Sequence, residues 1–137
     1  MHHDYLEKTR QYLSLLENFE SDSDAYRSLL HPDIEQTEYP NALTAMTKVR
    51  GFDQLLEGSR AGRQLLSAQT FDVQNVIGGT GGDNQLALEV LWTGTIAADL
   101  GAFRAGQKLT ANFCMVLEFK DGLLYRQRNY DCFQPFA

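Results

Sequence analysis

The last third of the chain alternates between apolar and polar positions. From residue 110 to residue 120 every second side chain is apolar, which is the period of a β-strand with one buried face. Asp121-Gly122 then offers a tight turn, and residues 123–133 return as a more polar strand. We therefore predict a long hairpin over Thr110–Lys120 and Leu123–Phe133 whose apolar row is Ala111, Phe113, Met115, Leu117 and Phe119.

The turn decides which side chains of the returning strand face that apolar row. A two-residue loop would pair Lys120 with Leu123 and place Arg126 and Arg128 beside the row, where unpaired guanidinium groups cost on the order of several kcal/mol each. A three-residue loop with a left-handed Gly122 would instead pair Phe119 with Leu123. We favour this second register, in which inward Gln127, Asn129 and Asp131 face Met115, Phe113 and Ala111, and Cys114 lies opposite Arg128.

The favoured register predicts an apolar chamber with a few convergent polar groups, which is the pattern of a ligand site. Trp92, Phe113 and Met115 would be its walls, with the amides of Gln127 and Asn129 beside them. An inward Asp131 must find donors or raise its pKa, and a raised pKa suits a general base.

The rest of the chain reads as helices followed by strands. Residues 4–19 have an amphipathic helical period, and a capped short helix ends near Leu30. The glycine run from Gly78 to Asp83 lacks a phosphate-loop ending and is read as a hairpin loop. This order predicts an α+β fold with a four-strand antiparallel meander wrapped around the helices. The remaining predicted elements are a strand Ile34–Tyr39, a helix from Phe52 to about Gly62, and strands Thr70–Ile77 and Gln85–Ala98.

Composition limits the partners. The 137 residues fit one domain, 1–137, and 43% hydrophobic content is enough for a core. A net charge of −6 without a basic stripe argues against nucleic acid. No apolar run is long enough for a membrane span or a signal peptide, so we expect a cytoplasmic protein that binds no membrane.

Cysteine and histidine positions bear on metals and disulfides. Cys114 and Cys132 would stand roughly 13 Å apart along the strand at the usual rise per residue, so we expect both to be reduced. The three histidines and two cysteines show no zinc-ligand spacing. We therefore expect no metal and no cofactor.

Several short segments, in this order, resemble the SnoaL-like polyketide cyclases of the nuclear transport factor 2-like superfamily. They cover nearly the whole chain: His31-Pro32-Asp33, Glu38-Tyr39-Pro40-Asn41, Trp92-Thr93-Gly94-Thr95, Gly106, Phe119-Lys120-Asp121-Gly122 and Arg128-Asn129-Tyr130-Asp131. The resemblance implies a cone-shaped, cystatin-like roll with a deep apolar pocket, which usually forms a homodimer through the outer sheet face. The superfamily includes cyclases, ketosteroid isomerase, dehydratases and members without a demonstrated reaction.

The resemblance also implies site residues. Tyr12 is similar to the helix tyrosine that binds the substrate oxyanion in ketosteroid isomerase, and Glu38 lies next to the position of that enzyme's base. Met115 stands where the isomerase has its second oxyanion-hole acid, and Ile96 where many cyclases have a histidine. Asp131 corresponds approximately to an acid near the end of the last strand.

Three functions remain open at this point. The first is a cofactor-independent cyclase or isomerase in which Asp131 or Glu38 abstracts a proton next to a carbonyl, while Tyr12 and an amide of Asn129 or Gln127 stabilise the enolate. The second is a non-catalytic module or dimeric scaffold that binds an apolar small molecule. The third is a protein-interaction domain that uses the outer sheet face.

Overall fold

A computed structural model describes residues 4–80 and 83–136. The start of the chain and the tip of the predicted glycine loop, residues 81–82, lie outside the described residues. The elements are, in order, α1 (Tyr5–Glu17), α2 (Ser23–Tyr26), β1 (Leu30–Glu38), β2 (Lys48–Arg50), α3 (Phe52–Leu65), β3 (Leu66–Gly78), β4 (Gln85–Ile96), β5 (Lys108–Lys120) and β6 (Leu123–Phe133).

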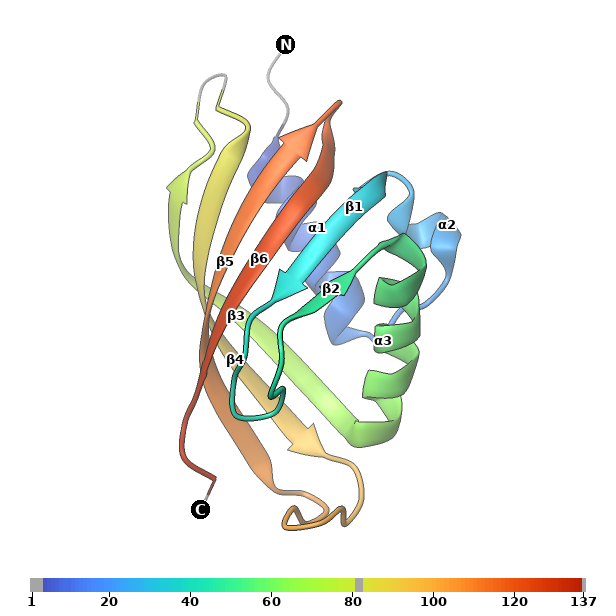
Figure 1. The fold of residues 1–137 in the computed structure, drawn as a ribbon, viewed down its shortest axis with the longest axis vertical. Helices are drawn as coiled ribbons and strands as arrows, with labels where there is room; N and C mark the ends of the chain where they lie inside the picture. Colours follow the sequence, from blue (N-terminus) through green and yellow to red (C-terminus); the bar gives the residue numbers. More distant parts are fainter. Residues whose placement is uncertain (1–3, 81–82, 137) are drawn as a thin grey trace.

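The six strands form one sheet in the order β2-β1-β6-β5-β4-β3. The predicted antiparallel meander runs from β3 to β6, and β1 adds to it in parallel beside β6. Helix α3 contacts β1 and β2 at one end of this order and β3 at the other. The sheet must therefore curve, and Figure 1 shows it bending around α1 with α3 along its open side. The predicted α+β fold with a curved sheet around the helices is confirmed.

Local chemistry explains where the helices begin. The Asp4 carboxylate accepts a hydrogen bond from the Glu7 amide at 2.9 Å and caps α1. At the start of α3, the Gly51 amide donates a hydrogen bond to Gln54 Oε1 at 2.8 Å. None of the helices in the described part of the chain is long and apolar enough to cross a membrane.

The β5–β6 turn differs from the predicted one. Lys120 pairs with Leu123, and Asp121 and Gly122 both have positive φ, 55° and 78°, as a two-residue type I′ turn requires. The prediction of a three-residue loop was therefore wrong. Asp-Gly is a favoured sequence for the two-residue turn, because both residues tolerate the left-handed region.

A β-bulge in β6 nevertheless turns the predicted side chains of this strand toward the interior. The register shifts between Glu118, which pairs with Arg126, and Phe119, which pairs with Leu124. Tyr125 has no partner on β5 and is the extra residue of the bulge. From Arg126 onward, each side chain of β6 therefore lies on the opposite face of the sheet from the one that the two-residue turn alone would give it. Gln127, Asn129 and Asp131 therefore point inward as predicted, but opposite Leu117, Met115 and Phe113, two residues away from the predicted partners.

The same shift corrects the position of the cysteines. Cys114 lies opposite Tyr130, not Arg128, and Cys132 lies opposite Asn112. The two thiols are thus diagonal neighbours on adjacent strands, which places their Cα atoms about 7–8 Å apart, closer than the expected separation. Both are free in the structure, and their reduced state stays a prediction.

Candidate functional site

The inward face of β6 carries a row of polar side chains in an otherwise apolar interior. Gln127 is 1% exposed and Asn129 is 8% exposed, and both lie among buried apolar residues of β5. Buried amides of this kind need hydrogen-bond partners. The structure supplies them from Tyr12 on α1 and from the two amides themselves.

Tyr12 on α1 is the first partner. Its hydroxyl donates to Gln127 Oε1 at 3.0 Å, and Gln127 Nε2 donates to Asn129 Oδ1 at 2.9 Å. Burial raises the pKa of Tyr12 well above its usual value, with the nearby Tyr26 adding to the effect, so the hydroxyl stays protonated. Its one proton is committed to Gln127 in this structure, and the proposed direct role of Tyr12 at an oxyanion stays a prediction.

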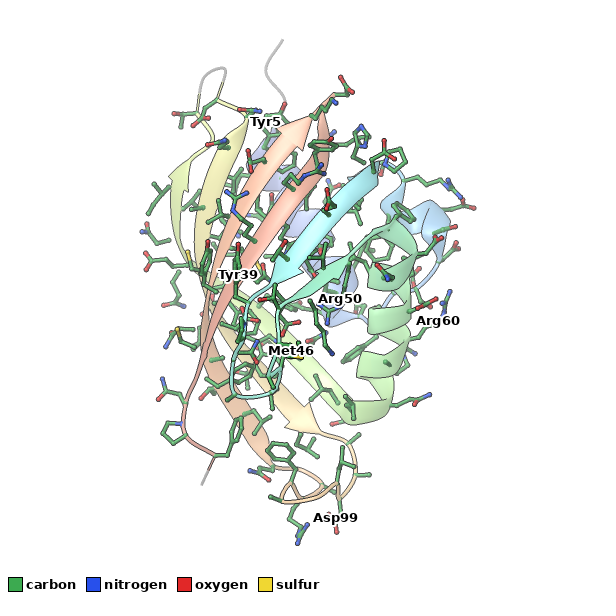
Figure 2. All side chains as sticks on the ribbon, in the orientation of Figure 1. Tyr5, Tyr39, Met46, Arg50, Arg60 and Asp99 are labelled. Carbon is green, nitrogen blue, oxygen red and sulfur yellow. The ribbon has the colours of Figure 1, made fainter. Side chains whose placement is uncertain are left out.

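Gln36 on β1 and Arg50 on β2 complete the cluster behind Tyr12. The Gln36 side chain lies close enough to the Tyr12 hydroxyl to lower its pKa, against the larger effect of burial, and Gln36 Oε1 accepts a hydrogen bond from an Arg50 guanidinium nitrogen at 3.3 Å. Figure 2 shows Arg50 between β2 and the helices, whereas Arg60 points away on the outer side of α3. Arg50 therefore belongs to the interior cluster.

Glu38, at the end of β1, is fully engaged by its neighbours. Its carboxylate accepts from Arg50 at 2.9 Å, from Asn41 Nδ2 at 2.9 Å and from the Thr44 hydroxyl at 3.0 Å. Burial alone would raise the pKa of Glu38, but these hydrogen bonds and the Arg50 charge hold it below its usual value. Glu38 is thus a stable anion that anchors the β1–β2 loop.

Asp131 differs from Glu38 in having a buried oxygen without a partner. Its Oδ1 accepts no hydrogen bond from the residues that the structure describes, and it faces Phe113 across the sheet. Burial, and then repulsion by Glu38, raise the pKa of Asp131 to about 7, with Arg50 opposing the shift. This carboxyl can therefore hold or release a proton near neutral pH.

Aromatic side chains form the apolar side of the site. Trp92 stacks on Phe113 with ring centroids 5.5 Å apart, and its Nε1 donates to Gln69 Oε1 at 3.0 Å. Phe133 meets both rings edge to face. Met115, 2% exposed, lies opposite Asn129. Of the predicted residues, Tyr12, Glu38, Gln127, Asn129 and Asp131 thus belong to one polar cluster, with Phe113 and Met115 beside it and Trp92 one strand further.

Two site residues were missed by sequence reasoning. Gln36 had a usable signal, because it stands two positions before Glu38 in the predicted strand and so shares its face. Arg50 had no such signal in the sequence, because β2 is only three residues long and is too short to show an alternation of apolar and polar side chains. Within residues 4–80 and 83–136, no three histidine, cysteine or acidic side chains gather as a metal site would need.

Arg126 and Arg128 lie on the opposite, outer face of the sheet. Arg126 forms an ion pair with Glu35 at 2.9 Å, and Arg128 with Glu118. The two arginines therefore lie outside the interior, and this agrees with the face of β6 that the sequence analysis favoured. Tyr130 is 45% exposed on the same outer face and stacks on Tyr39 at 4.9 Å.

Two open hollows lie away from this cluster. One, of about 370 Å³, lies beside the end of α1 and α3, and the other, of about 420 Å³, lies on the outer sheet face. Neither is lined by Asp131, Gln127 or Asn129, and the predicted deep interior pocket stays a prediction. The outer hollow is lined by Gln74, Glu89, Val90, Asn112, Phe113, Cys114, Tyr130 and Cys132.

Solved structures with the same fold include proteins from several bacteria. IdmH from Streptomyces antibioticus, provisionally assigned as a polyketide cyclase, superposes with a TM-score of 0.76 at 15% identity over 94% of this chain and 92% of its own. A provisionally assigned polyketide cyclase from Acidithiobacillus ferrooxidans gives 0.69 at 20% identity over 93% and 87%. A protein with a ketosteroid isomerase-like fold from Catenulispora acidiphila, solved with trimethylamine, gives 0.67 at 12% identity over 90% and 84%.

These identities establish a shared fold and no more. No curated protein sequence matches the chain. The sequence profile of the SnoaL-like domain, however, matches residues 9–127, which is most of the chain and includes Tyr12, Glu38 and Gln127. The protein therefore belongs to the SnoaL-like domain family.

Proposed function

We propose that this SnoaL-like protein is a cofactor-independent enzyme of the cyclase or isomerase type, in which the Asp131 carboxyl moves a proton on an apolar substrate that contains a carbonyl group. The observation that carries the proposal is the inward Asp131 with its unpartnered Oδ1. Glu38 is the weaker candidate for the base, since three donors already hold its charge.

The chemistry would proceed through an enolate. The Asp131 carboxylate takes a proton from the carbon next to the carbonyl, and the electron pair of the broken C–H bond moves onto the carbonyl oxygen. A neighbouring amide N–H, that of Asn129, stabilises the resulting anion. The protonated Asp131 then returns the proton to another carbon in an isomerisation, or to the oxygen of a second carbonyl that the enolate carbon has attacked in a cyclisation.

The pKa of Asp131 supports both halves of this cycle. A carboxyl group with a pKa of about 7 is partly ionised at neutral pH, so it can act as base and then as acid. An ordinary aspartate would be a weaker base and a poor proton donor at the same pH. The alternative function, a binding module for apolar ligands, needs the apolar wall but not this carboxyl.

Proton exchange tests the proposal without knowledge of the natural substrate. A panel of apolar aromatic ketones is incubated with the protein in D2O, and deuterium uptake next to the carbonyl is followed by NMR. We expect the wild type to catalyse uptake for some members and Asp131→Asn to lose at least about 100-fold of that rate. Ketones that bind with equal exchange rates in both proteins would leave the binding module as the function.

A further inference from the structure

The two cysteines of the chain line the same hollow. This hollow has a volume of about 420 Å³ and opens on the outer face of the sheet. Cys114 is partly exposed on β5, and Cys132 is exposed on β6, which runs beside β5 (Figure 1). Both thiols are free, and no hydrogen bond ties either of them to the described part of the chain. The hollow therefore presents two unengaged thiol groups together.

The register of the strands sets the distance between these thiols. Cys114 pairs with Tyr130 and Cys132 pairs with Asn112, so the cysteines are diagonal neighbours whose Cα atoms lie about 7–8 Å apart. A disulfide usually joins Cα atoms that are about 4.4–6.8 Å apart, because its sulfur atoms are only about 2.05 Å from each other. The diagonal spacing is therefore too long for a direct S–S bond without movement of the backbone.

A single metal ion between the sulfur atoms would fit this spacing. A metal–thiolate bond is about 2.3 Å long, so two thiolates on one ion hold their sulfur atoms roughly 4–4.6 Å apart. This separation is about 2 Å greater than in a disulfide. The longer reach covers the diagonal spacing of the two cysteines.

The number of available ligands selects the kind of ion. Within residues 4–80 and 83–136, no three histidine, cysteine or acidic side chains gather to hold a metal, whereas zinc takes four ligands. A soft monovalent ion with a filled d shell, such as Cu(I), binds thiolates strongly and is satisfied by two of them. Glu89 lies opposite Cys114 on β4 and also lines the hollow, so its negative charge favours a cation there.

We infer that Cys114 and Cys132 form a binding site for one soft monovalent ion of the Cu(I) type on the outer face of the sheet. On binding, each thiol releases its proton to water and forms one S–metal bond, so that the resulting bis-thiolate complex carries one negative charge overall. The site uses neither Asp131 nor any other residue of the interior cluster. It therefore stands or fails independently of the proposed function.

Competition with a coloured chelator measures this binding. The reduced protein is titrated without oxygen into the complex of Cu(I) with bicinchoninate, and the loss of colour gives the stoichiometry and the affinity. We expect one ion per chain. Cys114→Ser and Cys132→Ser should each weaken binding by at least about 100-fold, since the loss of a ligand should cost at least as much as the loss of a residue that only orients one.

Asn112→Ser is the matched control. Asn112 lines the same hollow opposite Cys132 but supplies no ligand, so this variant should bind the ion as the wild type does. If either cysteine variant keeps the wild-type affinity, or if Asn112→Ser loses it, the inference is overturned. One ion for every two chains would also overturn it, because thiols of two copies would then share the ion.

Two measurements on the wild type cover the case of a cysteine variant that fails to fold. X-ray absorption of the loaded protein should show two sulfur neighbours of copper at about 2.3 Å, and a single sulfur neighbour would contradict the paired site. Oxidation of the metal-free protein with diamide should leave the two thiols of one chain unjoined, since they lie beyond disulfide reach. A fast Cys114–Cys132 disulfide in mass spectra would show that the sulfur atoms meet directly, and the argument for a bridging ion would be lost.

Discussion

The Tyr12 hydroxyl donates a 3.0 Å hydrogen bond to Gln127 Oε1 and joins the first helix to the last strand across 115 positions of the sequence. Tyr12 is 2% exposed and Gln127 is 1% exposed, so neither group can turn to water if the other is lost. A buried acceptor without its donor costs more than the bond itself contributes. This pair therefore contributes to stability as well as to the arrangement of the site.

Tyr12→Phe should lower the free energy of unfolding by about 1–3 kcal/mol, since it leaves the Gln127 oxygen buried and unpaired. The measurement is urea unfolding followed by circular dichroism. Tyr130→Phe, at a side chain that is 45% exposed, serves as the control and should change stability by less than about 0.5 kcal/mol. Equal effects of the two variants would contradict the role assigned to the Tyr12 hydroxyl.

Gly94 is required by the ring of Trp92. A Cβ at position 94 would lie 2.4 Å and 2.5 Å from two carbons of that ring, closer than real contacts allow. We expect Gly94→Ala to displace Trp92 and lower the free energy of unfolding by about 1–3 kcal/mol. Because the chain has a single tryptophan, its fluorescence reports the displacement directly.

The control for this substitution is Gly58→Ala in the middle of α3. A Cβ at position 58 would meet nothing within 4 Å, and alanine favours a helix over glycine by about 0.5–1 kcal/mol. Gly58→Ala should therefore stabilise the protein with unchanged tryptophan fluorescence. An unchanged emission spectrum in Gly94→Ala would mean that Trp92 does not lie over that glycine.

Asp131 should make the folded protein less stable as the pH rises. Its pKa is about 7 in the folded protein and close to 4 in an unfolded chain, so the folded state binds more protons between these values. By linkage, stability falls as pH rises through this window. Asp131→Asn should remove that fall, and urea unfolding at intervals from pH 4 to pH 8 measures it. The exposed Asp33, changed to asparagine, is the control and should leave the wild-type slope intact.

Glu38 should have the opposite effect on the pH dependence of stability. Its pKa in the folded protein is lowered, so its contribution to stability is present above the pKa of an unfolded glutamate and is lost as the pH falls through the folded value. Glu38→Gln should be destabilised relative to the wild type at pH 7, and the difference should shrink below about pH 4. The comparison of unfolding free energies at pH 7 and pH 3 decides this, and a difference that persists at pH 3 would assign the effect to packing.

The hairpin shows which part of the site the sequence could predict. Burying Arg126 and Arg128 beside Leu117 and Met115 would be costly, and this argument identified the inward face of β6 correctly. Turn chemistry favoured a two-residue loop at Asp121-Gly122. Without a bulge, that loop would place Arg126 and Arg128 on the inward face of β6. The structure satisfies both with a bulge at Tyr125, and no periodic pattern in the sequence marks where an extra residue is inserted.

The polar network could not be predicted because its members come from separate elements. The inward amides of β6 and the inward Tyr12 follow from local periods, but their contacts depend on how α1 packs across the curved sheet. Arg50 comes from a three-residue edge strand that the pattern did not reveal. The acid was found because alternation along one strand suffices to place Asp131, whereas placing Arg50 beside Gln36 and Glu38 needed the tertiary structure.

The outer sheet face leads to the last prediction, that the chain forms a homodimer through it. Tyr130 and Tyr39 stack there with half-exposed surfaces, and Arg126 and Arg128 are each paired with an acid of the same chain, so the face carries little unbalanced charge that would repel a second copy. Sedimentation velocity should give about twice the mass of 15.5 kDa, and Tyr130→Glu should shift the protein toward monomer by adding a charge at the contact. Arg60→Glu on the outer side of α3 is the control; it changes the net charge by more than Tyr130→Glu does, yet it should leave the dimer intact. A wild type that sediments as a monomer would contradict the prediction.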